Sequence, residues 1–202
     1  MAQEFAGHVH IVDDEPGVRT AIAAMLGPGG FATSEYDTAD ALLAALDTLQ
    51  PGCIVTDVNL PGMNGIELVR HLKENGIEQP VIVISGQADI AMAVEAMKAG
   101  AIEFLEKPLH TEPLQNAVRA ALLIEAAPPS PDTERYVKIV QSLTRRQREV
   151  LSGVIEGLPN KLIAYRLGLS IRTVEGYRAA IMERTQAKSL SDLVRLGIKA
   201  GL

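Results

Sequence analysis

Val55-Thr-Asp-Val-Asn-Leu-Pro-Gly-Met-Asn-Gly65 ends a short β-branched run with an aspartate, Asp57, and follows it with residues typical of a turn. The run starts at Cys53 and is one of five that alternate with helical patterns. The other four are Val9 to Val12, Phe31 to Tyr36, Val81 to Ile84 and Ile102 to Leu105. This alternation predicts an α/β domain with a doubly wound parallel sheet of (βα)5 topology.

Apolar residues between these runs recur at helical spacing. The first helix carries Val18, Ile22 and Leu26, and the second extends from Ala41 to Leu49. A fifth helix is expected to begin at Thr111, with Pro113 tolerated in its first turn. The first domain is therefore predicted to span residues 1–125.

The pattern changes after residue 125. Three prolines in Ala126-Ala-Pro-Pro-Ser-Pro-Asp-Thr133 predict an extended linker, taken as residues 126–139. Residues 140–202 read as helices alone and predict an all-α domain of four helices. Thr144 and Gln147 form a capping-box pattern, and Ser170 and Ser189 cap later helices. Two of the helices, residues 160–167 and 171–184, flank a glycine turn, which predicts a helix-turn-helix.

Composition narrows the class of protein. Among the 202 residues, 47% are hydrophobic and 22% are charged, as in ordinary globular domains. The sequence carries no apolar run long enough to cross a bilayer and no signal-peptide pattern, so a cytoplasmic location without a membrane partner is expected. The single cysteine, Cys53, is expected in the core because apolar residues follow it.

Charge is divided unevenly along the chain. Residues 1–124 hold 6 Lys and Arg against 17 Asp and Glu, a net charge of −11, and residues 125–202 hold 13 against 8, a net of +5. The basic half can attract nucleic acid, although basic side chains on a solvated helical face give the same count.

Polar residues follow the carboxyl ends of the predicted strands, where open parallel sheets bind ligands. They are Asp13, Asp14, Asp57, Ser85 and Lys107. Each has an ordinary structural alternative, such as a helix cap or a surface charge. Taken together, three carboxylates at one edge repel one another unless a hard cation such as Mg²⁺ binds between them. The sequence therefore predicts a magnesium site.

Residues 9–123 resemble the receiver domain of two-component response regulators. The resemblance rests on His10-Ile-Val-Asp-Asp-Glu15, on the 55–65 segment quoted above, on Ser85-Gly86 and on Phe104-Leu-Glu-Lys-Pro108. It implies that a sensor histidine kinase phosphorylates Asp57, and that Asp13, Asp14, Asp57 and the carbonyl of Asn59 bind Mg²⁺. Lys107 would then face the phosphoryl group, and Ser85 and Phe104 would form the switch.

An aspartate nucleophile with Mg²⁺ also suits phosphatases of the haloacid-dehalogenase type, which is the competing enzyme class. Those proteins carry an acid–base aspartate two positions after the nucleophile. Asn59 occupies that position here and cannot transfer a proton in the same way. We therefore expect a phosphoaspartate that hydrolyses slowly, and a protein that is not a turnover enzyme.

The C-terminal residues resemble the LuxR-type helix-turn-helix, so that the whole chain is similar to the NarL/FixJ family, and Met92 to Gly100 points to its FixJ-type branch. The resemblance rests on Leu143 to Leu151, Gly157 to Ala164 and Leu169 to Glu175. It implies binding to double-stranded promoter DNA, with the recognition helix in the major groove. The candidate DNA-binding residues are Lys161, Arg172, Thr173, Glu175, Tyr177 and Arg178. A protein or RNA partner for this domain is the alternative.

Leu162 and Tyr177 depart from the family pattern, which more often has glutamate and histidine there. Val94 and Lys98 lie four residues apart and share a helical face. The resemblance implies that this face forms a homodimer after phosphorylation. A core role for Val94 and a solvated one for Lys98 are the alternative.

Overall fold

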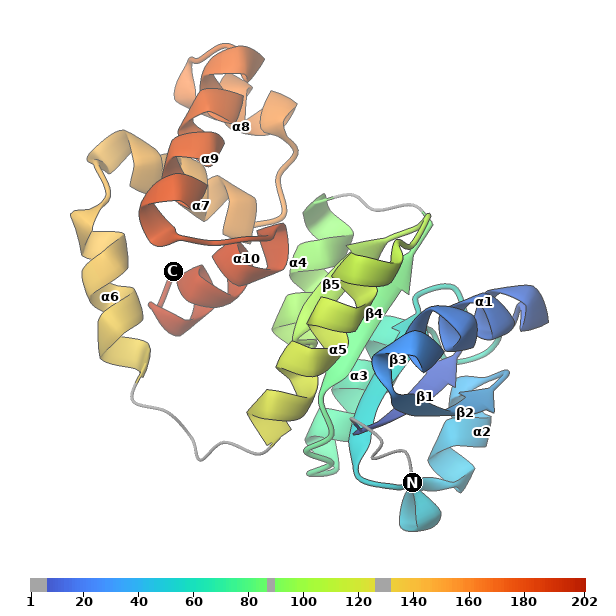
Figure 1. Ribbon diagram of the computed structural model, residues 1–202. Coiled ribbons are helices and arrows are strands. Elements are labelled where there is room, and N and C mark those ends of the chain that lie inside the picture. Colours follow the sequence, from blue (N-terminus) through green and yellow to red (C-terminus); the bar gives the residue numbers. More distant parts are fainter. Residues whose placement is uncertain (1–6, 87–89, 126–131) are drawn as a thin grey trace. The chain divides into compact units, whose positions relative to one another are not determined.

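The computed structural model describes residues 7–86, 90–125 and 132–202. Its sheet has five parallel strands in the order β2-β1-β3-β4-β5 (Figure 1). The predicted (βα)5 α/β fold is confirmed. The strands are β1 (Gly7–Val12), β2 (Phe31–Tyr36), β3 (Gly52–Asp57), β4 (Val81–Ser85) and β5 (Glu103–Glu106).

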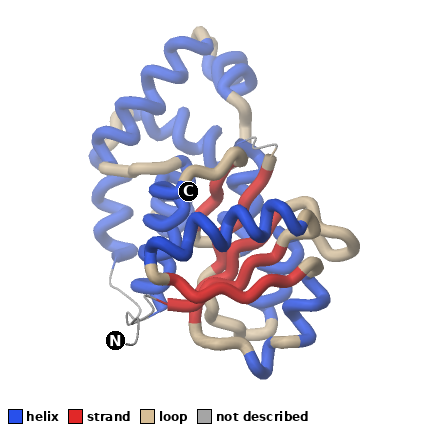
Figure 2. The backbone as a smooth tube through the Cα atoms, turned by 45° about the vertical axis from the view of Figure 1, so that its right-hand side comes forward, coloured by secondary structure: helices blue, strands red, loops and turns tan. Residues whose placement is uncertain are grey.

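Helices lie on both faces of this sheet (Figures 1 and 2). α1 and α5 pack against each other and against the central strands. Apolar residues that alternate along β1, β3 and β4 point toward them, and Cys53 is among these core residues, as predicted. The helices that follow the strands are α1 (Pro16–Leu26), α2 (Ala39–Ala44), α3 (Gly65–Glu74), α4 (Ile90–Ala99) and α5 (Thr111–Glu125).

The second helix is shorter than the sequence predicts. α2 ends at Ala44, and a single 3-10 turn, Leu46–Thr48, replaces the rest of the expected helix. The apolar spacing of Ala45 and Leu49 therefore does not continue the helix. By contrast, α5 begins at Thr111 as predicted.

The helical part holds the predicted helix-turn-helix. Thr144 and Gln147 form the predicted capping box, and Ser170 and Ser189 cap the two last helices. Gly168 ends α8 in the left-handed region, with a φ of 65°, a conformation that glycine adopts without strain. The four predicted helices are α7 (Arg145–Ile155), α8 (Asn160–Leu167), α9 (Ile171–Thr185) and α10 (Leu190–Lys199).

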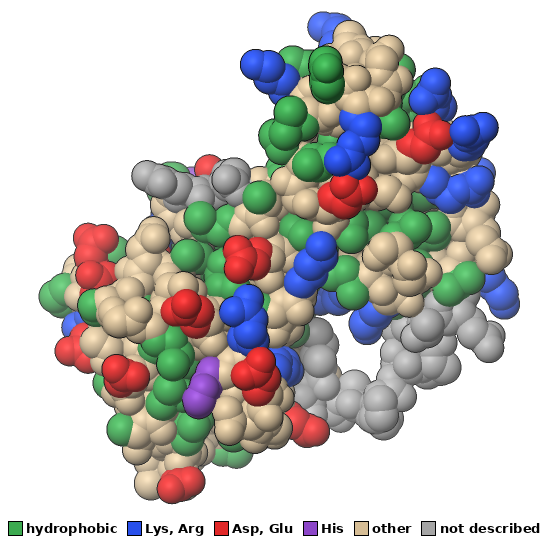
Figure 3. Space-filling model, turned by 180° about the vertical axis from the view of Figure 1, so that it is seen from behind, with side chains coloured by type: hydrophobic (Ala, Val, Ile, Leu, Met, Phe, Trp, Pro, Cys, Tyr) green, Lys and Arg blue, Asp and Glu red, His purple; other side chains and the backbone are tan. Residues whose placement is uncertain are grey.

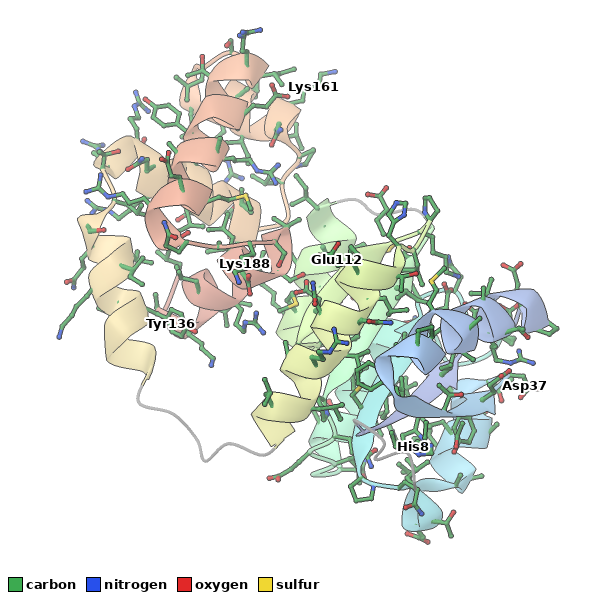
Figure 4. The ribbon with its side chains drawn as sticks, viewed as in Figure 1. His8, Asp37, Glu112, Tyr136, Lys161 and Lys188 are labelled. Carbon is green, nitrogen blue, oxygen red and sulfur yellow. The ribbon has the colours of Figure 1, made fainter. Side chains whose placement is uncertain are left out.

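A further helix, α6 (Asp132–Ser142), lies where a linker was predicted. Residues 126–131 of that linker lie outside the described residues, and residues 132–139 are helical instead of extended. The physical reason is that this helix packs on α10. Val140 of α6 is buried, as is Leu143 just after the helix. The Lys199 ammonium of α10 lies 5.6 Å from the centre of the Tyr136 ring, which Figure 4 labels.

Tertiary contacts divide the chain into two compact units. The first contains the sheet with α1, α2, α3 and α5, and the second contains α6 to α10. Residues 90–98 of α4 group with the second unit, although the sequence pattern counts this helix in the first domain.

Candidate functional site

Asp57 is the last residue of β3, at the carboxyl edge of the sheet. β3 pairs with β1 on one side and β4 on the other, so this edge also carries the residues that follow β1 and end β4. Asp57 is 4% exposed and Asp13 is fully buried. Two carboxylates that are buried away from solvent need a compensating positive charge.

Lys107 provides that charge. Its Nζ lies 2.6 Å from Oδ1 of Asp57 and 2.9 Å from Oδ2 of Asp13, so one ammonium bridges both carboxylates. Burial by itself lowers the pKa of Lys107, but hydrogen bonds to Asp57 and Asp13 and their charges outweigh it and raise the pKa above its ordinary value. The peptide bond between Lys107 and Pro108 is cis.

Backbone groups hold the remaining carboxylate oxygens. The amide of Asn59 donates to Oδ2 of Asp57 at 2.5 Å, and the amide of Glu15 donates to Oδ1 of Asp13 at 2.9 Å. Each oxygen of an ionised carboxylate accepts about two hydrogen bonds. Both side chains are thus held in place and keep capacity for a further ligand.

The start of α3 is packed directly against the phosphoacceptor candidate. A Cβ added at Gly65 would overlap the carbonyl oxygen of Asp57, and the Gly65 amide donates to the carbonyl of Val58 at 2.9 Å. Asn64 and Glu67 form a capping box that fixes where this helix begins. The glycine therefore permits the close approach of α3 to Asp57.

The two predicted switch residues lie on the neighbouring strands. Ser85 is fully buried at the end of β4, and its carbonyl accepts the backbone N–H of Lys107 at 2.8 Å. Phe104 is half-buried on β5, opposite Val83 of β4. Ser85 therefore lies beside the backbone of the lysine that contacts Asp57.

The predicted metal ligands are only partly brought together. Lys107 joins Asp13 and Asp57, and Asn59 contacts Asp57 through its backbone, but Asp14 is exposed. Within the described ranges, no three His, Cys, Asp or Glu side chains gather closely enough to ligate one metal ion. Two buried carboxylates that share one ammonium keep a net negative charge. Such hard oxygen donors fit Mg²⁺, with water completing its shell.

The candidate DNA-binding residues of the second unit fall into two groups. Lys161, Arg172, Thr173 and Glu175 are exposed at the beginnings of α8 and α9. Figure 4 labels Lys161 on α8, and Figure 3 shows Lys and Arg side chains spread over the surface of the helical unit. The Thr173 hydroxyl lies 2.8 Å from that of its cap, Ser170. This group is accessible to a nucleic acid.

The second group is half-buried. It consists of Tyr177 and Arg178. Nη1 of Arg178 donates to Oδ1 of Asn160 at 2.8 Å, which joins α9 to the first residue of α8. Burial lowers the pKa of this guanidinium, and the charge of Glu175 opposes that shift. Arg178 thus has a bond inside the domain that the sequence did not predict.

Three other residues escaped the sequence analysis. Arg19 donates to the carbonyl of Asp13, Asn160 accepts from Arg178, and Tyr165 on α8 is 87% exposed. Arg19 follows Asp13 by six residues across the turn from β1 to α1, and that spacing does not show which way its side chain points. Asn160 and Arg178 are 18 residues apart across a turn, and the sequence carries no signal for their bond.

The two residues predicted for a dimer interface differ in exposure. Val94 is 3% exposed and Lys98 is exposed, although both lie on α4. Every helix within residues 7–86, 90–125 and 132–202 is too short or too polar to cross a lipid bilayer.

Comparison with known proteins matches two families in the same order along the chain. Residues 9–119 match the response regulator receiver domain, and residues 141–196 match the luxR family of bacterial regulatory proteins. The transcriptional regulatory protein FixJ of Bradyrhizobium diazoefficiens is 42% identical over 200 residues, with 97% of each chain covered. FixJ of Rhizobium meliloti is 46% identical over 195 residues, with 96% of each covered.

Solved structures agree with these matches. The crystal structure of full-length FixJ from B. japonicum has a TM-score of 0.57 and 41% identity, and the alignment covers 98% of each chain. Receiver domains generally use Mg²⁺ at their acidic pocket, which agrees with the buried Asp13 and Asp57. The chain therefore belongs to the two-component response regulators, as a FixJ-like transcription regulator with a receiver domain and a LuxR-type DNA-binding domain.

Proposed function

We propose that Asp57 accepts a phosphoryl group from a phosphohistidine of a sensor histidine kinase, and that this event controls dimerisation and promoter binding. The observation that carries the proposal is the 2.6 Å contact between Nζ of Lys107 and a buried carboxylate at the carboxyl edge of the sheet. A carboxylate held by a lysine and a backbone amide is positioned for in-line displacement.

In this reaction a carboxylate oxygen of Asp57 bonds to phosphorus as the phosphorus–nitrogen bond of phosphohistidine breaks. The bonding pair returns to the imidazole nitrogen of the kinase. Lys107 moves from the carboxylate toward the incoming phosphoryl oxygens and offsets their charge. Bound Mg²⁺ supplies further charge neutralisation, with Asp13, Asp57, the carbonyl of Asn59 and the nearby Asp14 as the residues that would hold it.

The signal then passes to the two switch residues, Ser85 and Phe104. The hydroxyl of Ser85 donates a hydrogen bond to the new phosphoryl group, and Phe104 follows into the space that Ser85 leaves. Asn59 lacks the acid–base function of a phosphatase aspartate, so hydrolysis is slow and the protein is not a turnover enzyme.

Phosphorylation promotes a homodimer through the face of α4. Lys98 is the exposed member of the predicted pair and contributes directly, and Val94, being buried, contributes through the packing of this helix. Two output domains then bind one promoter, and the second recognition helix raises affinity through effective concentration. We place this activity in the cytoplasm, where the kinase domain and DNA are available.

A phosphorylation assay tests the proposal. The full chain is incubated with labelled acetyl phosphate and Mg²⁺, beside Asp57→Asn and a sample treated with EDTA. Label is expected on the wild-type chain in Mg²⁺ alone. Equal labelling of Asp57→Asn, or of the EDTA sample, would contradict the site.

A further inference from the structure

Arg19 connects the acidic pocket to the edge of the sheet. It lies in the first turns of α1, and its side chain is 16% exposed. Nη1 donates to the carbonyl oxygen of Asp13 at 2.6 Å, and Nε donates to Oε2 of Glu35, on β2, at 3.3 Å. One planar guanidinium thus binds the end of β1 and a carboxylate of the neighbouring strand.

The amide, the carbonyl and both carboxylate oxygens of Asp13 are hydrogen-bonded. Its amide donates to the carbonyl of Tyr36 at 3.2 Å, and its two carboxylate oxygens accept from Glu15 and Lys107. Arg19 binds the carbonyl, which lies on the peptide group between Asp13 and Asp14. The guanidinium therefore acts at the point that sets the direction of both acidic residues.

The charge of Arg19 is offset nearby. A bare guanidinium close to the pocket would repel a cation, but Glu35 pairs with it at the sheet edge. The pair leaves a directional hydrogen bond on the Asp13 carbonyl with little excess positive charge. This arrangement matches the way outer partners orient metal ligands in proteins.

We propose that Arg19 is a positioning residue that sets the Mg²⁺ affinity of the pocket through the Asp13–Asp14 segment, with Glu35 as its charge partner. The inference rests on the metal site of the proposed function. Arg19 itself touches neither the metal nor the phosphoryl group. A purely structural role, fastening α1 to β2, would change stability and leave the Mg²⁺ affinity of the folded protein unaltered.

Mg²⁺ titration of the full chain separates these roles. The amide signals of Glu15 and Asn59 report on the pocket in ¹⁵N–¹H spectra, because these amides bind the carboxylates of Asp13 and Asp57. The variants are Arg19→Ala, Arg19→Lys and Glu35→Ala. Arg119→Ala is the matched control, because this arginine of α5 bonds to Gln115 and lies over the Phe31 ring instead of contacting Asp13.

Arg19→Ala is expected to bind Mg²⁺ about tenfold more weakly than the wild type, as for loss of an outer partner of a metal ligand. Arg19→Lys should recover part of this loss, since an ammonium can reach the carbonyl but lacks the fork that also holds Glu35. Glu35→Ala should weaken binding about threefold, since it exposes the cation to an unpaired charge. Arg119→Ala should bind as the wild type does.

Wild-type affinity in Arg19→Ala, or an equal loss in Arg119→Ala, would overturn the inference and leave the proposed metal site standing. Absence of any Mg²⁺ response in the wild type would overturn both. If Arg19→Ala fails to fold, Glu35→Ala decides: weakened binding supports the inference, and unchanged binding overturns it.

Discussion

Nζ of Lys107 lies 2.6 Å from Oδ1 of Asp57, at the buried end of β3. Lys107→Met should therefore leave two carboxylates with no ammonium between them. Without Mg²⁺, we expect the free energy of unfolding of the first unit to fall by about 2 kcal/mol. Added Mg²⁺ should restore part of this loss, because it binds the folded state. Hydrogen exchange of the β3 and β4 amides measures this for the first unit alone.

Lys73→Met, which removes an exposed ammonium from α3 of the same unit, is the control and should change little. A Lys107→Met variant as stable as the wild type in the absence of Mg²⁺ would show that the bridge does not hold the pocket.

Stability of the first unit should fall in mild acid because of two histidines on β1. His8 and His10 lie with ring centres 4.7 Å apart; burial is the main cause that lowers the pKa of each from its ordinary 6.5. The unfolded chain therefore binds protons more readily than the folded one below pH 6.5. Stability is fully present above that pH and is lost as pH falls, by at most about 1.4 kcal/mol per pH unit for each histidine.

Urea unfolding at several pH values between about 7.5 and 5.5, followed by the β1 and β3 amide signals, measures how the free energy of unfolding changes with pH. His10→Gln should flatten the slope, and His110→Gln, at an exposed position, should not. A slope that is the same in wild type and His10→Gln would refute the assignment to His10.

Gly65→Ala should disturb the phosphoacceptor itself. The new methyl group would overlap the Asp57 carbonyl, so α3 or the end of β3 must shift. We expect a loss of about 1–3 kcal/mol in stability and slower labelling of Asp57 by acetyl phosphate. Gly17→Ala is the control, because a Cβ there meets no atom within 4 Å. Normal labelling of a folded Gly65→Ala protein would contradict the need for this close approach.

Arg178 and Asn160 should behave as a pair in a double-mutant cycle. Their hydrogen bond fastens α9 to α8, so the stability losses of Arg178→Ala and Asn160→Ala should be non-additive by about 1 kcal/mol. The stability change of Arg172→Ala, at an exposed position, should add to those of the pair. This variant should also reduce the slope of log K for DNA binding against log salt concentration by about one. Additive losses for the first pair would mean that the bond contributes nothing.

The features that could be predicted from the sequence are the strands, the residues at their ends and the helix caps. Asp57 and Ser85 end strands and Asp13 and Lys107 follow strands, all of which the apolar pattern predicts, and parallel pairing brings those ends to one edge. The capping residues Thr144 and Ser170 were equally readable, because a cap acts within a few residues. Features that depend on the direction of a side chain could not be predicted from the sequence. Neither the bridge of Lys107 over two carboxylates nor the exposed position of Asp14 follows from spacing.

Long-range side-chain contacts account for the remaining differences. The bond between Arg178 and Asn160 crosses a turn, and that between Arg19 and Asp13 joins a helix to a strand end. α6 was missed because the prolines before it outweighed the apolar Val140, and the packing of α6 on α10 is a long-range contact. Such features require the fold before they can be predicted.

The most direct test of the account compares DNA affinity before and after phosphorylation of one sample. A genomic DNA fragment that the full chain retards in a gel shift serves as the ligand. The affinity of the full chain for this fragment is measured before and after treatment of the protein with acetyl phosphate and Mg²⁺. Asp57→Asn is measured in the same way. The account predicts tighter binding by the wild type after treatment and no change in Asp57→Asn. Equal affinity of the wild-type protein before and after confirmed labelling of Asp57 would contradict it.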